Sequence, residues 1–158
     1  MAEESPTEMV EELAARKAEA VVNLHNKKED NCLIIGADTI VVLDGKILGK
    51  PSDEADAKTM LASLSGRTHQ VYTGVALFSL KEGIIEKKTT FHECTDVTMV
   101  SMTEKEIADY VASGDPMDKA GAYGIQGMAA IFISEIKGDY YNVVGLPISR
   151  VYHEIEQF

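Results

Sequence analysis

Residues 32–43 read CLIIGADTIVVL, and this stretch decides the class of fold. The apolar runs at its two ends are of the kind found in buried strands. Gly36-Ala37-Asp38-Thr39 lies between the runs, so the sequence predicts two strand segments with a break between them. Asp44-Gly45 follows directly and is typical of a hairpin turn, which leads back into Lys46-Ile47-Leu48.

Helices and strands are predicted on both sides of this stretch. Ser5 can cap a helix that begins at Pro6, because Glu8 completes a capping box and apolar residues then recur at helical spacing. Further helices are expected over 53–64, after the capping box Thr103-x-x-Glu106, and from Pro147 onward. Further strands are expected over 71–80, 84–102 and 129–136.

The order of these elements predicts the fold class. Strands and helices mix without strict alternation, which favours an α/β protein with one long, curved, mixed sheet flanked by helices. The chain has 158 residues, and 45% of them are hydrophobic. This length and composition fit a single domain over residues 1–158 with a core of its own.

Charge and hydropathy exclude several classes of partner. The formal net charge of -11 argues against nucleic acid as the main ligand, although lysines and arginines focused in a cleft can still hold a small anion. No apolar run approaches the length of a membrane span, so no membrane partner is expected. The N-terminus is acidic and lacks the pattern of a secretory signal. A cytoplasmic location is therefore expected by default.

Asp38 and Lys17 stand out because each carries a charge in apolar surroundings. Asp38 lies between the two apolar runs, where a carboxylate is costly unless a ligand or a partner compensates it. The alternative is an Asx turn with Thr39. Lys17 falls on or beside the apolar stripe of the first helix, where the alternative is a lysine whose ammonium reaches out to water from the helix edge.

Two further cations follow chain-bending glycines. Lys50, in Gly49-Lys50-Pro51, is held at a fixed place by its neighbours, but the residues alone favour a surface turn. Arg67 follows Gly66 and suits bidentate recognition of phosphate; it could instead cap the carbonyls that end the preceding helix. His69 could act as an acid or base, although a histidine that opens a strand is more often structural.

Residues 118–127 read DKAGAYGIQG, which allows the backbone to approach a ligand closely. Lys119 brings a positive charge, Tyr123 an aromatic face, and Gln126 an amide that can read a base edge. The spacing is neither that of a P-loop nor that of a Rossmann fingerprint. The alternative is a tight connection between a helix and a strand. From the residues alone, these features favour metal-assisted phosphate chemistry.

Several motifs occur in the order and at the spacings of one known family. They are Gly36-Ala37-Asp38-Thr39, Gly49-Lys50-Pro51, Ser65-Gly66-Arg67-Thr68-His69-Gln70-Val71, the segment 118–127, and Val144-Gly145-Leu146-Pro147. On these motifs the sequence resembles, over nearly its whole length, the Maf family, which is named for an effect on septum formation. The resemblance implies a fold like that of the inosine-triphosphate pyrophosphatases and hydrolysis of nucleoside triphosphates.

The resemblance implies catalytic roles for particular residues. Asp38 corresponds to a proton acceptor that activates water for attack on the α-phosphorus and also touches a metal. Lys17 and Lys50 correspond to lysines that neutralise phosphate charge, and Glu4 to a carboxylate that supports the metal. The expected cofactor is a divalent cation, magnesium in the first place and manganese as an alternative.

Substrate choice is also implied. The residues expected to bind substrate are Thr39, Arg67, Lys119, Tyr123 and Gln126. The glycine-rich segment resembles the branch of the family that acts on dTTP and UTP, with CTP and modified pyrimidine nucleotides as further candidates. The expected products are the nucleoside monophosphate and pyrophosphate, and a homodimer is the expected assembly.

The family also has an N-terminal Ser-x-Ser-Pro-Arg-Arg segment, and Ser-Pro-Arg-Arg does not occur in residues 1–158. Because that segment grips phosphates in the family, the expectation is a chain truncated at its N-terminus and impaired in catalysis or stability. The alternative function is a nucleotide-binding or sensing module, linked to control of cell division, that has lost catalysis.

Overall fold

The computed structural model describes residues 4–24 and 31–158. Its helices are α1 (Pro6–Leu24), α2 (Glu54–Leu64), α3 (Glu104–Ala112), α4 (Tyr140–Val144) and α5 (Ile148–Gln157). Its strands are β1 (Cys32–Leu43), β2 (Lys46–Leu48), β3 (Thr68–Lys81), β4 (Ile84–Met99) and β5 (Ile133–Lys137). Short 3₁₀ turns are η1 (Asp115–Asp118), η2 (Ala120–Ala122) and η3 (Met128–Phe132).

The strands form one open sheet. The order is β2-β1-β3-β4-β5, and every pairing among the described strands is antiparallel. The α/β class and the long sheet flanked by helices are confirmed, but the expectation of a mixed sheet is wrong for this part of the chain. Tight turns connect β1 to β2 and β3 to β4, and such turns can join only antiparallel neighbours.

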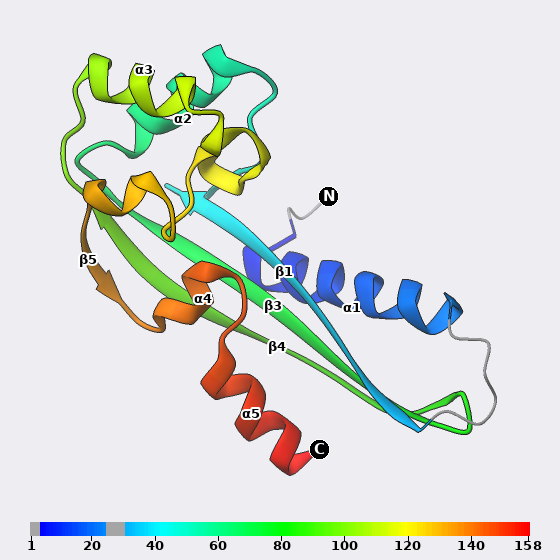
Figure 1. Ribbon diagram of the computed structural model, residues 1–158. Helices are drawn as coiled ribbons and strands as arrows, with labels where there is room; N and C mark the ends of the chain where they lie inside the picture. Colours follow the sequence, from blue (N-terminus) through cyan, green and yellow to red (C-terminus); the bar gives the residue numbers. More distant parts are fainter. Residues whose placement is uncertain (1–3, 25–30) are drawn as a thin grey trace.

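Helices cover both faces of the sheet. Figure 1 shows α1 along one side of the long strands β1, β3 and β4, with α4 and α5 on the other side. Residue alternation along β3 agrees with this arrangement, because Ala76 and Phe78 pack with α1 whereas Val75 and Leu77 pack with Val151 of α5. None of the helices in residues 4–24 and 31–158 is long and apolar enough to cross a membrane.

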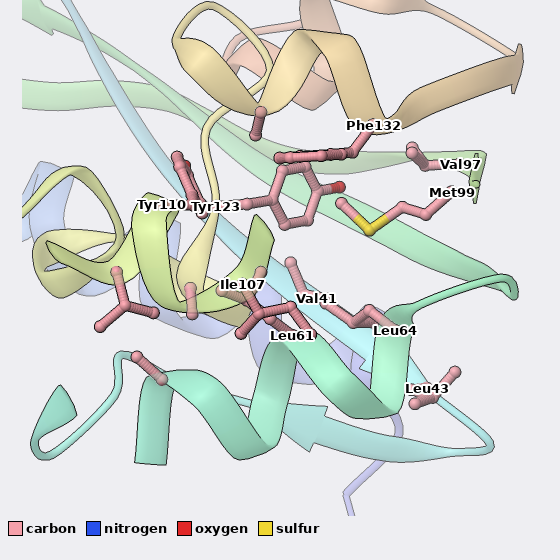
Figure 2. Close-up of a cluster of buried hydrophobic side chains, with 14 of the residues drawn as sticks. Val41, Leu43, Leu61, Leu64, Val97, Met99, Ile107, Tyr110, Tyr123 and Phe132 are labelled. Atoms are coloured by element: carbon pink, nitrogen blue, oxygen red, sulfur yellow. The ribbon is translucent and has the colours of Figure 1, made fainter. Parts of the chain in front are cut away.

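The main hydrophobic core lies at one end of the sheet, beneath α2 and α3 (Figure 1). Figure 2 shows side chains from many elements meeting there, including Leu61 of α2, Ile107 of α3 and Val41 of β1. Tyr123, from the glycine-rich segment, is part of the same cluster and is only 5% exposed. The glycine-rich segment is therefore anchored on the core.

The helix caps and the hairpin turn predicted from the sequence are confirmed, because each depends on residues that are close along the chain. The Glu8 amide donates to Ser5 Oγ at 3.3 Å, and the Glu106 amide donates to Thr103 Oγ1 at 3.1 Å. The helix expected over 53–64 is confirmed as α2, with Asp53 as its N-cap. The hairpin turn has positive φ at both central residues, 51° at Asp44 and 76° at Gly45, which matches the twist of the flanking strands.

The break expected at Gly36-Ala37-Asp38-Thr39 is wrong, because β1 runs through it without interruption. Gly36 has a different function there. A Cβ atom at this position would lie 2.4 Å from the carbonyl oxygen of Ala14, so only glycine allows α1 to approach the strand so closely. Asp38 consequently lies within a strand rather than in a loop.

The strand expected over 129–136 is also partly wrong. Residues 128–132 form the 3₁₀ turn η3, and β5 begins only at Ile133. The turn places Ala129 and Phe132 in the core, whereas Ile131 is 75% exposed. Spacing of i and i+3 suits one face of a 3₁₀ helix, and burial of these two side chains explains the turn.

Candidate functional site

A cleft of about 430 Å³ lies at the edge of β1, between α1 and the glycine-rich segment. Residues 37–39 of β1 pair with β3, whereas β2 pairs only with residues 41–43, so no described strand lies against the outer edge at 37–39. The polar side chains that line the cleft are those of Lys17, Asp38, Thr39, Lys50, Asp118, Lys119, Tyr123 and Gln126. The volume suits a small-molecule ligand.

Lys17 and Asp38 meet because α1 lies directly on the sheet. The glycines Gly36 and Gly74 leave room for the helix backbone, and a Cβ at Gly74 would lie 2.1 Å from the Val10 carbonyl oxygen. The Lys17 ammonium then reaches Asp38 Oδ1 at 2.5 Å and donates to the Ala37 carbonyl at 3.1 Å. The side chain of Lys17 is 58% exposed and that of Asp38 20%, so the pair faces the solvent-filled cleft.

The glycine-rich segment is fixed to β1 and to the loop that carries Lys50. Gly121 has a φ of 71°, and a Cβ there would lie 2.9 Å from the Val41 side chain, so the segment lies against β1. The Gly121 amide donates to the Gly49 carbonyl at 3.1 Å. This hydrogen bond holds Lys50 beside the segment, and the Lys50 side chain lies on the cleft wall.

Lys119 is surrounded by oxygen atoms of its own segment. Its ammonium donates to the Asp115 carbonyl at 2.8 Å, to Asp115 Oδ1 at 3.1 Å and to Asp118 Oδ1 at 3.0 Å. The hydrogen bond to Asp118 is the main cause of the raised pKa of Lys119. A hydrogen bond from Tyr110 is the main cause of the lowered pKa of Asp115. Lys119 is therefore a preorganised cation in the cleft wall.

Tyr123 lines the cleft, but its hydroxyl points into the protein. The Tyr123 oxygen lies 2.6 Å from Nε2 of the buried His69. Burial is the main cause of the raised pKa of Tyr123, so the phenol stays neutral. The polar end of the ring thus faces His69, and the part of the ring that reaches the cleft is apolar.

The structure brings Lys17, Asp38, Thr39, Lys50, Lys119, Tyr123 and Gln126 to one cleft. It does not place Arg67 or Glu4 among the lining residues. Arg67 donates to both carboxylate oxygens of Asp44, at 2.7 and 2.6 Å, on the β1–β2 turn. Glu4 lies exposed before the first residue of α1, where a hydrogen bond with Glu12 is the main cause of its raised pKa.

Some residues that shape the site carried no recognisable signal in the sequence. Asp115 orients Lys119 from a turn, and Thr73 lies directly across the sheet from Thr39. The backbone carbonyl of Asn142, in α4, accepts a hydrogen bond from Thr73 Oγ1. Each acts through a contact with a distant segment, which composition and spacing do not reveal. Asp118 was recognisable as a charged residue of the glycine-rich motif, yet no catalytic, substrate-binding or metal-binding role was expected for it.

The cleft can hold a polyanion and activate water beside it. Lysines from α1, from the loop after β2 and from the glycine-rich segment line one space, which favours phosphate oxygens. The Asp38 carboxylate lies in the same space and can accept a proton from water. Among residues 4–24 and 31–158, no group of three or more His, Cys, Asp or Glu side chains is placed to hold a metal ion.

Comparison with known proteins identifies the family. The model of the family described as Maf-like protein matches residues 1–158. A dTTP/UTP pyrophosphatase of Bacillus mycoides is 55% identical over 154 residues, which are 98% of this chain and 76% of the relative. Proteins of the same name from Bacillus cytotoxicus and Bacillus thuringiensis subsp. konkukian are 54% and 53% identical over the same shares. The chain belongs to the Maf-like protein family.

Proposed function

We propose that this protein is a nucleoside triphosphate pyrophosphatase that hydrolyses dTTP and UTP to the monophosphate and pyrophosphate. The observation that carries the proposal is the cleft itself, where the Asp38 carboxylate faces the same space as Lys17, Lys50 and Lys119. The names of relatives above 50% identity support the choice of substrate. CTP and modified pyrimidine nucleotides are the next candidates.

Asp38 is the proposed general base. Lys17 holds its Oδ1 in place, which leaves Oδ2 to accept a proton from a water molecule. The oxygen of that water forms a bond to the α-phosphorus, and the bond from the α-phosphorus to the bridging oxygen of the β-phosphate breaks. The leaving group is pyrophosphate, and the Lys17 and Lys50 ammonium groups neutralise its charge.

The remaining cleft residues are proposed to bind the substrate. Lys119 adds positive charge to the wall, and its bonds to Asp115 and Asp118 keep the ammonium in one position. Tyr123 offers an apolar ring face, and the exposed amide of Gln126 can both donate to and accept from a base. Arg67 and Glu4 have no place in this mechanism, because they do not line the cleft.

A divalent cation is the proposed cofactor, with magnesium preferred and manganese as the alternative. Magnesium binds through one or two carboxylates together with substrate phosphates, and Asp38 with Asp118 on the cleft wall fits that requirement. When bound there, such an ion would supply electrostatic stabilisation of the negative charge that develops on the substrate. Glu4 does not contribute a ligand in this proposal.

Pyrophosphate release from dTTP, UTP, CTP and ATP with magnesium tests the function. The wild-type protein is expected to prefer dTTP and UTP, and Asp38→Asn to lose about 10²- to 10⁴-fold in kcat because the amide cannot accept the proton. Asp44→Asn is the matched control, since Asp44 pairs with Arg67 outside the cleft lining. Nucleotide binding without turnover in the wild type would instead select a binding or sensing module.

The cellular setting stays a prediction. We expect a single domain in the cytoplasm that forms a homodimer and binds no nucleic acid. Light scattering measures the molar mass in solution, and cell fractionation measures the location. The formal net charge of -11 predicts that the protein does not bind nucleic acid, and a gel-shift experiment with duplex DNA checks this prediction.

A further inference from the structure

Thr39 and Thr73 form a cross-strand pair beneath the cleft. They lie directly opposite each other in β1 and β3, and their hydroxyl oxygens are 2.8 Å apart. Thr73 is completely buried, whereas Thr39 is half-buried and lines the cleft. Each hydroxyl has a single hydrogen, so the direction in which each one donates decides what Thr39 offers to a ligand.

The surroundings of Thr73 fix that direction. Its oxygen lies 2.9 Å from the backbone carbonyl oxygen of Asn142 in α4, and a carbonyl oxygen can only accept. The Thr73 hydrogen is therefore directed at Asn142. Thr73 has no second hydrogen, so in the pair with Thr39 it must accept, and Thr39 must donate.

Asn142 is itself held in place by its side chain. Its amide nitrogen donates to the Val71 carbonyl at 3.1 Å and to Thr95 Oγ1 at 2.9 Å. Thr95 in turn donates to the Asp139 carbonyl at 3.0 Å. Because Val71 presents a carbonyl oxygen, which can only accept, the side-chain amide of Asn142 cannot be flipped without losing its bond to Val71. The fixed side chain holds the residue in place, and its backbone carbonyl therefore stays directed at Thr73. The hydrogen-bonded series from Thr39 through Thr73 to Asn142 is thus anchored on both β3 and β4.

We propose that Thr73 and Asn142 are positioning residues that make Thr39 a hydrogen-bond acceptor toward the cleft, and that this acceptor receives the N3–H of a uracil or thymine base. The hydrogen of Thr39 is used inside the protein, so only lone pairs of its oxygen remain for a ligand. Uracil and thymine carry a hydrogen on N3. Cytosine has a lone pair at N3, and two lone pairs facing each other are unfavourable.

The inference rests on the proposed function for its substrate and adds how the cleft distinguishes pyrimidine bases. Its test is the ratio of kcat/KM for UTP to that for CTP. In Thr73→Val, which keeps the shape and removes the acceptor, the Thr39 hydroxyl is free to turn its hydrogen toward the cleft and to serve cytosine. We expect the ratio to fall about tenfold, the effect of one hydrogen bond. The change is expected in KM, because the base does not take part in the chemical step.

Matched variants separate positioning from a loss of folding. Thr73→Ser retains the hydroxyl and should keep the ratio of the wild type. Thr68→Val removes a hydroxyl from another cross-strand threonine pair, with Thr98 at 2.7 Å, outside the cleft lining, and should leave both the ratio and the activity unchanged. If Thr73→Val does not fold, Thr39→Val carries the test, since loss of the acceptor must also lower the ratio.

A double-substitution cycle gives the decisive comparison. In a Thr39→Val background, Thr73→Val should not change the ratio further, because its effect passes through the Thr39 hydroxyl. An unchanged ratio in folded Thr73→Val, or an equal loss for UTP and CTP, overturns the inference.

Calorimetric binding of UTP and CTP tests the acceptor separately from turnover. A protein that binds UTP in preference to CTP through Thr39, but releases no pyrophosphate, contradicts the proposed function and supports this inference. A protein that releases pyrophosphate, but whose preference for UTP over CTP does not depend on Thr73, supports the proposed function and contradicts this inference. A protein that binds neither nucleotide overturns both.

Discussion

At the scale of single residues, His69 shows how a buried polar group supports the cleft without lining it. The ring is completely buried, its Nε2 meets the Tyr123 hydroxyl at 2.6 Å, and its Nδ1 has no hydrogen-bond partner among the described residues. Burial of the ring lowers the pKa of His69 from 6.5 to about 4. The structural reading of this histidine therefore fits better than a role as acid or base at neutral pH.

This lowered pKa predicts a loss of stability in mild acid. Between pH 6.5 and about 4 the unfolded chain binds a proton at His69 and the folded chain does not. Stability is thus fully present above pH 6.5 and falls as the pH drops, by up to roughly 3 kcal/mol from this group. Urea unfolding of the wild type and of His69→Gln across this range measures the difference. Parallel pH profiles for the two proteins would contradict the prediction.

At the scale of elements, the docking of α1 on the sheet controls where Lys17 lies. Gly36 of β1 and Gly74 of β3 are not directly opposite, but both face α1, and their missing side chains allow the helix backbone to lie against the strands. Lys17 and Asp38 meet as a result. A small change at either glycine should therefore act on both stability and catalysis.

Gly74→Ala tests this close approach. The added Cβ would lie 2.1 Å from the carbonyl oxygen and 2.3 Å from the carbonyl carbon of Val10, and backbone atoms cannot move aside as a flexible side chain can. We expect the free energy of unfolding to fall by about 3 kcal/mol or more, with a loss of activity as α1 shifts. Gly49→Ala is the control, because nothing lies within 4 Å of its Cβ position. Equal unfolding midpoints for the two variants would refute the account.

The same elements show what the sequence can predict. The caps at Ser5 and Thr103 and the turn at Asp44-Gly45 were predictable because each depends on hydrogen bonds or dihedral angles within a few residues. The glycine-rich segment was recognisable from its composition. Gly36 was interpreted as a break because glycine more often marks one; its contact with Ala14 is tertiary and leaves no local pattern.

Misplaced residues have the same explanation. Arg67 follows a helix-ending glycine and could have faced a phosphate, but its guanidinium pairs with the carboxylate of Asp44 on another turn. The short helix α4 was not expected, yet it supplies Asn142 to the buried chain of hydroxyls. These outcomes depend on which segments meet across the sheet, and spacing along the chain does not encode that directly.

At the scale of the whole molecule, the cleft joins parts that pack separately. α1 and the strand face that it covers form two hydrophobic clusters, while the glycine-rich segment belongs to the core beneath α2 and α3 (Figure 2). Lys17 comes from the first part and Lys119 from the second. A polyanion bound between these two parts would attract the lysines of both. A bound nucleotide should therefore stabilise the molecule as a whole.

Thermal unfolding with a non-hydrolysable UTP analogue and magnesium tests this coupling. Ligand at about 100 times its Kd adds roughly 2.7 kcal/mol, which should raise Tm by about 5–10 °C for a domain of this size. Lys50→Met should reduce the rise, because it removes a cation from the cleft wall while leaving the hydrophobic clusters intact. Lys58→Met, on an exposed face of α2 away from the cleft, should show the full rise. The same rise in Lys50→Met as in Lys58→Met would place the nucleotide elsewhere, and no rise in the wild type would show that the cleft does not hold it.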